Sequence, residues 1–387
     1  MRNQLLYITS HKLSDNNGGA NCSKFFVNAF AKLFDDCSII FPAFDEPHAV
    51  IPSKYKQYPC FDKRCKIKKG IDMYMGVVSA LYAFIIKHIK IHSYKIIVID
   101  HSVTGTSLVK ILKATGAKLI TIHHNVEKDY LKDNGAERPI IYRHAYNYYA
   151  LKSEKECLEN SDINITLTEK DASVFRTWYK AKDIHAYCVS SRECINIPRK
   201  EFETKTNGYT FAITGSLSFI QSVSSILLFL EKYYPILRKC CPDCSLLITG
   251  RNPAPILVKK CDIDPTINLI PNPIDINSVI KQADFYICPI NKGSGMKQRV
   301  MDGLRQGLTI LCHEVSVYGY ENFEKEQFLY RYNDEKSFKS SVEKLTSNRK
   351  PKPVVYEKFR KEFSFDTGVT ILREILTAEK MIPKDSD

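Results

Sequence analysis

Residues 284–320 read DFYICPINKGSGMKQRVMDGLRQGLTILCHEVSVYGY, and this stretch decides the fold that we expect. It begins with a compact apolar run, Phe285 to Ile290, which has the length and composition of a strand buried on both faces. A glycine-containing loop leads into a predicted helix from Met296 to Gln306, and Gly307 is its stop signal. Leu308 to Cys312 is a second buried strand. The order strand, loop, helix, strand predicts a right-handed crossover in a parallel sheet.

The loop ahead of that predicted helix has the chemistry of a phosphate site. Gly293, Ser294 and Gly295 let the backbone turn tightly and leave its N–H groups uncovered. Such N–H groups at a helix start, together with the positive end of the helix dipole, attract phosphate. Lys297 follows in the first turn, from which its side chain can lean back toward the loop. The alternative is that Ser294 only caps the helix and Lys297 is an exposed solubilising charge. The spacing alone leaves both interpretations open.

The segment GSGMKQRVMDGLRQGLTI resembles the donor site of retaining GT-B glycosyltransferases of family 4, the glycosyl transferases group 1. Their usual pattern is G-S-G-x-K-x-K-x-x-E-A-x-x-x-G-x-P-V. The resemblance implies that Lys297 and loop amides such as that of Gly295 hold a donor diphosphate. It also implies that an acid later in the helix, here Asp302, bonds the ribose hydroxyls. The sequence departs from the commoner form with two glutamates, because Ser294 stands at the first position and the shorter Asp302 at the second.

The resemblance continues in the preceding part of the second half. Tyr209 to Thr214 reads as a strand, followed by a tight turn at Gly215. Family members open their nucleotide domain with a similar G-x-L turn and carry a basic residue nearby against the donor phosphates. That basic residue is missing from GSLSFIQSVSS, so the resemblance gives Lys297 more of the phosphate charge, with Arg251 or Arg299 as helpers. Each arginine, taken singly, could equally form a surface ion pair.

Two strand ends in the first half carry histidines. Lys95 to Asp100 is a predicted strand followed by His101, and Lys118 to Ile122 is another, followed by HHNVE. Ligands bind at the carboxyl ends of parallel strands. Many transferases of the resembling family carry H-N-x-E or H-H-N-x-E here, with a histidine near the donor sugar. Neighbouring side chains face opposite ways, so one of the two histidines reaches the site, and alignment favours His123 over His124. The plain alternative is a packed, hydrogen-bonded histidine.

The chain starts with a predicted strand from Asn3 to Ser10. SDNNGGANCSKFFVNAFAKLF follows, which reads as a glycine loop running into an amphipathic helix. Gly18 and Gly19 would let a sugar or phosphate approach the backbone, although two adjacent glycines often mark only a turn. In the resembling family a glycine loop at this place lies beside the donor diphosphate and the acceptor.

A basic stretch interleaved with aromatic residues, SKYKQYPCFDKRCKIKK, spans residues 53–69, and an apolar helix is predicted from Met73 to Ile91. A basic, aromatic surface beside an apolar helix suits the headgroup layer of an anionic membrane. The alternative is a solvated loop followed by a buried helix of a Rossmann-like domain. Both interpretations remain open.

Composition limits the class of protein. The chain has 387 residues, of which 44% are hydrophobic and 26% charged, so we expect two globular domains. The net charge of +13 calls for an anionic partner and does not by itself identify one. Thirteen scattered cysteines, an odd number, indicate a reducing cytoplasm and show no zinc spacing.

We therefore predict an α/β protein of the GT-B class, with two Rossmann-like doubly wound domains facing each other across a cleft. The predicted parts are an acceptor-binding domain at 1–195, a linker at 196–207, a nucleotide-sugar-binding domain at 208–365, and a helix at 366–387 that crosses back. The resemblance implies retention of anomeric configuration with no metal and no cofactor. The expected partners are a nucleotide-sugar donor, a saccharide acceptor that we take to be lipid-linked, and an anionic membrane surface, with no nucleic acid. The expected place is the cytoplasm, peripheral to the inner face of the plasma membrane, in synthesis of a capsule, O-antigen or related glycan.

The candidate catalytic residues are His123 and Lys297. The candidate donor-binding residues are Gly18, Gly19, Gly215, Arg251, Ser294, Gly295, Met296, Lys297, Arg299 and Asp302, and the secondary candidates are His101, His124, Asn125 and Glu127. Two other functions stay open. A sugar-nucleotide epimerase of the same plan would rearrange the donor without an acceptor, and a non-enzymatic basic binding protein would explain the charge alone.

Overall fold

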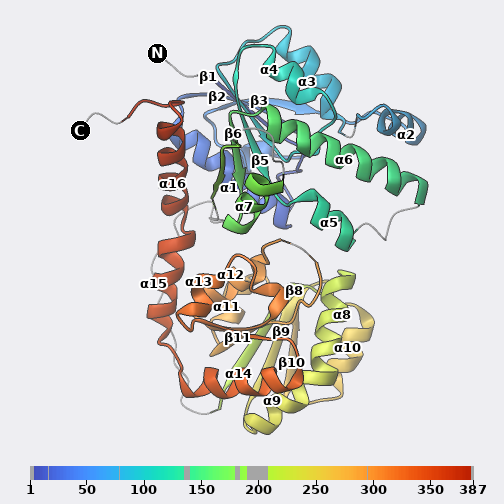
Figure 1. The fold of residues 1–387 in the computed structure, drawn as a ribbon. Coiled ribbons are helices and arrows are strands. Elements are labelled where there is room, and N and C mark those ends of the chain that lie inside the picture. The colour runs from blue at the N-terminus through green and yellow to red at the C-terminus, as the bar shows by residue number, and fades with distance from the viewer. Residues whose placement is uncertain are drawn as a thin grey trace. The chain divides into compact units, whose positions relative to one another are not determined.

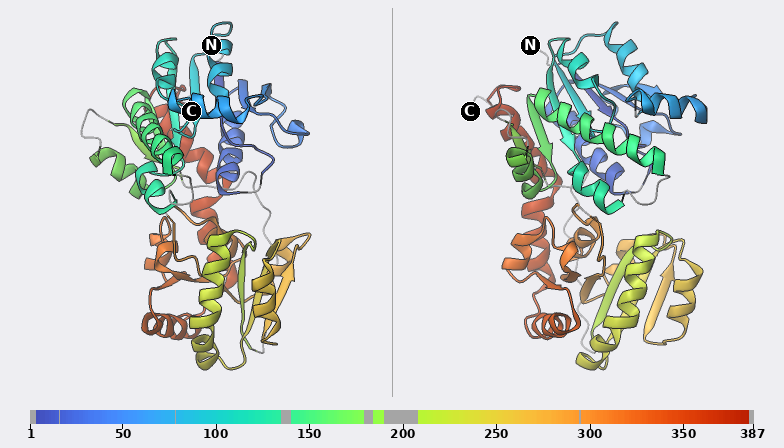
Figure 2. Two further views of the ribbon diagram at one scale, coloured as in Figure 1. Left: turned by 90° about the vertical axis from the view of Figure 1, so that its right-hand side faces the viewer. Right: turned by 45° about the vertical axis from the view of Figure 1, so that its right-hand side comes forward.

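A computed structural model gives the fold of the chain (Figures 1 and 2). It describes residues 4–15, 17–77, 79–134, 140–178, 184–189, 208–293 and 295–384, without the side chains at 4, 133, 134, 140–142 and 178. The chain forms two compact units. One holds Met1–Ile197 and Glu362–Asp387, and the other holds Pro198–Lys361. The predicted linker at 196–207 lies outside the described residues, so that boundary stays a prediction.

The first unit is built on a parallel sheet with the order β3-β2-β1-β4-β5-β6-β7. Its strands are β1 (Gln4–Thr9), β2 (Asp36–Pro42), β3 (Tyr55–Cys60), β4 (Ile96–Asp100), β5 (Lys118–His123), β6 (Ile163–Thr166) and β7 (Ala186–Cys188). The sequence predicted β1, β4, β5 and β6 and missed the other three. β3 lies at an edge of the sheet, where exposed positions accept polar side chains such as Lys56. Because residues 53–69 are so basic, no strand was predicted within them.

Helices cover both faces of this sheet, as the alternation along β1 shows. Leu5 and Tyr7 belong to one buried cluster, and Leu6 and Ile8 belong to another on the opposite face. The helices of the unit are α1 (Gly18–Leu33), α2 (Lys66–Tyr74), α3 (Leu81–Ile89), α4 (Leu108–Lys113), α5 (Glu127–Asn134), α6 (Ile140–Asn160), α7 (Glu169–Trp178) and α16 (Phe365–Ala378).

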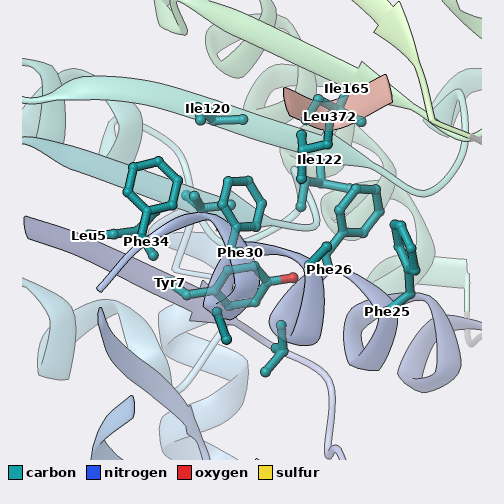
Figure 3. Close-up of a cluster of buried hydrophobic side chains, with 14 of the residues drawn as sticks. Leu5, Tyr7, Phe25, Phe26, Phe30, Phe34, Ile120, Ile122, Ile165 and Leu372 are labelled. Atoms are coloured by element: carbon teal, nitrogen blue, oxygen red, sulfur yellow. The ribbon is translucent and has the colours of Figure 1, made fainter. Parts of the chain in front are cut away.

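The face with Leu5 and Tyr7 is closed by the phenylalanines of α1 and by α16. Figure 3 shows Phe25, Phe26 and Phe30 of α1 against the strands, with Leu372 of α16 beside Ile165. The closing segment of the chain thus completes the core of the first unit.

The helix predicted from Met73 to Ile91 is wrong. The structure has two helices here, because α2 ends at Tyr74 and α3 begins at Leu81. Gly76 separates them with φ +77, and a Cβ at this glycine would lie 2.3 Å from Thr106 Oγ1. α2 also begins inside the basic stretch, which one of the two open interpretations treated as a solvated loop. Gly76 donates its N–H to Met73 O at 3.0 Å and ends α2 as Gly307 ends α12, a stop signal in the sequence that the periodicity argument overlooked.

The second unit has a smaller parallel sheet with the order β10-β9-β8-β11-β12-β13. Its strands are β8 (Thr210–Ser216), β9 (Ser245–Arg251), β10 (Ile267–Pro271), β11 (Phe285–Cys288), β12 (Thr309–His313) and β13 (Leu329–Tyr332). Its helices are α8 (Ile220–Leu228), α9 (Tyr234–Cys240), α10 (Pro255–Asp262), α11 (Ile276–Ile280), α12 (Gln298–Arg305), α13 (Glu321–Lys325), α14 (Glu335–Ser347) and α15 (Lys352–Phe363). Among the described residues, no helix of either unit is long and apolar enough to cross a bilayer.

The stretch that opened the sequence analysis folds as β11, a loop, α12 and β12, with β11 and β12 paired in parallel. α12 starts at Gln298, two residues later than predicted, so Met296 belongs to the loop. Gly307, with φ +73, ends the helix: its N–H donates to Leu304 O at 2.9 Å.

Gly303 brings α12 close to the sheet. A Cβ on this residue would lie 2.6 Å from both Ile310 Cδ1 of β12 and Tyr286 Cγ of β11. The start of α12 is therefore positioned by direct packing of its middle on the two strands that flank it in the sequence.

Candidate functional site

Each sheet has a point at which the strand order reverses, and parallel sheets bind ligands at such points. In the second unit the chain passes from β8 outward through β9 to β10, and then returns to β11 on the other side of β8. The loops after β8 and β11 therefore leave the sheet from adjacent strands. In the first unit β1 and β4 have the same relation, and β5 follows next to β4. The candidate residues gather at these two places.

The loop after β11 is folded around Lys297. Gly293 and Gly295 have φ +92 and +74, which side-chain-bearing residues rarely adopt. Their carbonyl oxygens accept hydrogen bonds from Lys297 Nζ at 2.6 and 3.2 Å. The carbonyl of Lys297 in turn accepts from the Tyr320 hydroxyl at 2.8 Å. The ammonium group is thereby held over the glycine loop at the entry to α12.

The loop after β8 lies close to the same helix start. A Cβ at Gly215 would lie 2.4 Å from Arg299 Cζ, so the guanidinium rests directly on the bare backbone of this glycine. Arg299 Nη2 donates to Ser222 Oγ of α8. Its Nη1 is buried and has no hydrogen-bond partner among the described residues. A buried N–H without a partner is costly, and an anion bound here would remove that cost.

The structure places the remaining donor candidates differently. Asp302 lies on α12 with its side chain 37% exposed, and its Oδ1 is 3.5 Å from Arg305 Nη1. Arg251 ends β9 with an exposed side chain, and its backbone oxygen accepts from Leu217 N at 2.9 Å. Met296 is half-buried in the loop, and Ser294 lies outside the described residues. Of the two possible helpers for Lys297, Arg299 is the one held between both loops.

In the first unit, three side chains meet where β1, β4 and β5 end. His124 Nε2 bonds Asp100 Oδ1 at 2.6 Å, and both side chains are buried. The ring of His11 stacks on that of His124 with centroids 4.6 Å apart. His11 Nδ1 bonds the Ser23 hydroxyl of α1 at 2.9 Å.

The charges of this cluster follow from its contacts. Burial opposes a charged imidazole at His124, but the Cys22 sulfur and the Asp100 carboxylate favour it and raise its pKa to about 10. Burial alone would raise the pKa of Asp100, yet His124 holds it below its ordinary value. Burial and the charge of His124 lower the pKa of His11 to about 4. One protonated imidazole and one carboxylate thus form a buried ion pair beside a neutral imidazole.

His11, Asp100 and His124 could also hold a metal ion, because their ligand atoms lie within 4.8 Å of one another. His124 Nε2 and Asp100 Oδ1 bond each other directly at 2.6 Å, which leaves no room for an ion between these two atoms, and His11 Nδ1 bonds Ser23. The geometry therefore favours a hydrogen-bonded pair over a metal centre.

Two further candidates border this cluster. His101 has φ +86, an unfavourable conformation for a residue with a side chain, and its Nε2 is 3.7 Å from Glu127 Oε1. Burial and the charge of His124 lower the pKa of His101 well below its ordinary value. Glu127 is buried, and its N–H donates to the Glu154 carboxylate at 2.7 Å. Asn125 is half-buried on the same turn.

His123, which alignment favoured, lies apart from the cluster. Its Nε2 bonds Asn164 Oδ1 at 3.0 Å, and its ring packs on Phe175 with centroids 4.8 Å apart. Burial lowers its pKa to about 4. The structure thus gives His123 the packed environment of the plain alternative and places His124 among the other polar groups.

The N-terminal glycines lie in the first turn of α1, whereas the sequence predicted them in a loop. Asn17 caps this helix by accepting from Ala20 N at 3.0 Å. A Cβ at Gly19 would lie 2.6 Å from His11 Nε2, so this glycine makes room for the histidine. Sequence reasoning missed His11, although its position just after β1 was the available signal.

Comparison with known proteins gives the family. The family model of the glycosyl transferases group 1 matches residues 208–348, which include both loops around Lys297 and Arg299. The second unit belongs to the glycosyl transferases group 1. Transferases of this group use nucleoside-diphosphate sugars, retain the anomeric configuration and need no bound metal ion, so the family and the enzyme class predicted from the sequence are confirmed. A search of curated proteins by sequence gave no match.

Solved structures extend the glycosyltransferase fold to the whole chain. The Anabaena protein HepE in complex with UDP and glucose superposes with a TM-score of 0.62 at 10% identity, covering 97% of this chain and 100% of that one. The lipopolysaccharide outer core galactosyltransferase WaaB gives 0.66 at 10% identity, covering 97% and 99%. A candidate UDP-N-acetylglucosamine 2-epimerase from Listeria monocytogenes gives 0.60 at 10% identity, covering 100% and 99%. At such identities these likenesses confirm the predicted GT-B fold.

Proposed function

We propose that this glycosyltransferase moves a sugar from a nucleoside diphosphate to a hydroxyl of a lipid-linked saccharide in the synthesis of a bacterial surface polysaccharide. The second unit binds the donor and the first unit binds the acceptor. The named activity of WaaB, on lipopolysaccharide, supports this class of acceptor by analogy of fold. The net charge of +13 supports an anionic partner.

The observation that carries the proposal is the pair of cations at the point where the strand order of the second unit reverses, which we call its switch point. Lys297 covers the glycine loop after β11, and Arg299 rests on Gly215 after β8 with a buried N–H group free of partners among the described residues. Two cations beside glycine backbone at a helix start are what a diphosphate requires. They take the place of the basic residue that is absent from the turn after β8.

The chemistry follows from those charges. As the bond from the sugar to the diphosphate breaks, negative charge grows on the leaving oxygen, and Lys297 and Arg299 stabilise it. A phosphate oxygen of the donor takes the proton of the acceptor hydroxyl, which attacks from the same face. His124, held by Asp100, is the imidazole that we assign to the sugar in place of His123, because it belongs to the polar cluster at the strand ends.

Lys297→Ala tests this assignment, with Lys292→Ala as its matched control. Lys292 belongs to the same loop and carries the same charge, but its side chain is exposed. Loss of one preorganised donor to a developing anion lowers kcat by about 100- to 1,000-fold. We expect that loss for Lys297→Ala with the enzyme still folded at the assay temperature, and full activity for Lys292→Ala. Equal activity of the two variants would refute the role of Lys297.

The same assay separates transfer from epimerisation. Without an acceptor, a transferase leaves the donor sugar almost unchanged apart from slow hydrolysis, whereas an epimerase rearranges it. Rapid conversion of the donor to a second sugar nucleotide in the absence of acceptor would therefore contradict the proposed function.

A further inference from the structure

α2 carries an apolar stripe that points away from the body of the first unit. Ile67, Ile71 and Tyr74 follow one another at helical spacing, with Met75 and Phe61 beside the ends of the helix. These five side chains are 54% to 76% exposed. An amphipathic helix of a globular domain normally turns such a stripe toward the core.

The other side of α2 is fixed to the domain. Asp72 and Met73 are the buried residues of the helix. The Tyr149 hydroxyl of α6 donates to the carbonyl of Tyr74, and Gly76 seats the end of the helix close to Thr106. The stripe is thus presented outward by a helix that is anchored at its base. Figures 1 and 2 show α2 at the periphery of the unit, away from the sheet.

Basic side chains are frequent in the segment that carries the stripe. Residues 61–75 contain five basic and two acidic side chains, a net charge of +3. Arg64 joins Asp62 to Asp72 at 3.0 and 3.2 Å, which ties the preceding loop to the helix. Lys63 and Lys66 are exposed and form no ion pair with any described residue. We call the apolar stripe together with these lysines the α2 patch.

We propose that the α2 patch docks this enzyme on the headgroup layer of an anionic membrane. The proposal deepens the proposed function and rests on it for the lipid-linked acceptor. Aliphatic and aromatic side chains on an anchored helix enter the boundary between headgroups and acyl chains, and lysines beside them pair with anionic lipids. A protein partner would meet the apolar stripe equally well, but the unpaired positive charge at its rim favours an anionic surface.

Cosedimentation with vesicles tests the proposal on the full chain, without nucleotide. We expect binding to vesicles of phosphatidylcholine with about one-third phosphatidylglycerol, weaker binding in high salt, and little binding to phosphatidylcholine alone. Each charge near an anionic surface changes partitioning by about five-fold. Lys63→Gln with Lys66→Gln should therefore weaken binding at least about ten-fold, and Ile67→Ser with Ile71→Ser should abolish it.

α10 supplies matched controls in the second unit. Ile256 and Ile263 are 60% and 78% exposed, and Lys259 and Lys260 are exposed on the same helix. Serine at the two isoleucines, or glutamine at the two lysines, should leave vesicle binding unchanged. Equal losses of vesicle binding in the α2 and α10 variants would overturn the proposal. Wild-type binding that does not depend on the charge of the lipid would overturn it as well. A wild-type dimer that the isoleucine changes in α2 convert to a monomer would also overturn it, since the stripe would then serve a second copy.

The outcome is independent of the transfer chemistry. Loss of vesicle binding in the α2 variants with normal transfer to a soluble acceptor supports the docking surface. If the wild type binds vesicles as expected but Lys297→Ala keeps full transfer activity, the proposed function is refuted. The proposal that the α2 patch docks on a membrane is then unaffected.

Discussion

Arg299→Met is the change that best separates a functional arginine from a structural one. The substitution keeps an unbranched apolar stem and removes the guanidinium group with its charge and its N–H groups. In the structure the guanidinium rests against Gly215, bonds Ser222, and buries Nη1 without a partner among the described residues. If Arg299 is there to bind phosphate, methionine should weaken donor binding and leave stability nearly unchanged.

The magnitudes follow from the contacts. A hydrogen bond to a charged group contributes about 1.5–3 kcal/mol, which corresponds to a roughly 10- to 150-fold change in Kd. Against folding, Arg299→Met removes the bond from the charged guanidinium to Ser222, worth about 1.5–3 kcal/mol, and also removes a buried N–H whose desolvation costs about 1–3 kcal/mol. These two effects oppose each other. The free energy of unfolding should therefore change by no more than about 2 kcal/mol in either direction.

Calorimetric titration with a panel of nucleoside diphosphates, together with urea unfolding of the unliganded enzyme, measures both quantities. Arg251→Met is the informative comparison, because Arg251 was the other helper that the sequence offered and its side chain is exposed at the end of β9. We expect the smaller loss of affinity for Arg251→Met. If Arg299→Met bound diphosphates like the wild type while losing more than about 2 kcal/mol of stability, the arginine would be a structural residue and the reasoning would be wrong.

Two further predictions concern the folds of the units. Gly303→Ala should destabilise the second unit by about 1–3 kcal/mol, seen as a lower Tm, because the new methyl group would lie 2.6 Å from Tyr286 and Ile310; an unchanged Tm would refute the close packing of α12. Asp100→Asn should remove a pH dependence of stability. The raised pKa of His124, about 10, means that its contribution is complete below its unfolded pKa near 6.5 and is lost as the pH rises toward 10. Denaturant midpoints between pH 7 and pH 10 should accordingly fall less steeply in Asp100→Asn than in the wild type.

The sequence predicted those features that depend on neighbours along the chain. The order of strand, glycine loop, helix and strand from Phe285 to Cys312 was visible because buried strands and an amphipathic helix have different periods. Gly307 ended its helix as predicted, since a left-handed residue there completes the last turn. These local rules also located β4 and β5, whose ends carry the histidine cluster.

Features that depend on contacts between distant segments were not predictable in the same way. Arg299 comes from α12 and Gly215 from the turn after β8, so neither position by itself indicates that they meet. The helix predicted through Gly76 failed for a different reason, because this left-handed glycine at the end of α2 is a local stop signal that the prediction overlooked. Which of His123 and His124 packs beside Asn164 of β6 depends on the side of the sheet to which each ring points, and only coordinates give that information; the choice of the histidine that contacts the sugar stays a prediction.

The two switch points differ in charge, and this difference argues for the assignment of substrates. In the second unit, Lys297 and Arg299 leave an excess of positive charge, which suits the two phosphates of a donor. In the first unit, the charge of His124 is matched by Asp100, and the low pKa values of His11 and His101 keep those rings neutral. Glu127 lies beside His101 and adds no positive charge, so this cluster has no positive excess to attract phosphate but can exchange hydrogen bonds with sugar hydroxyls. We therefore infer that the histidine cluster contacts a sugar and that the diphosphate belongs to the second unit.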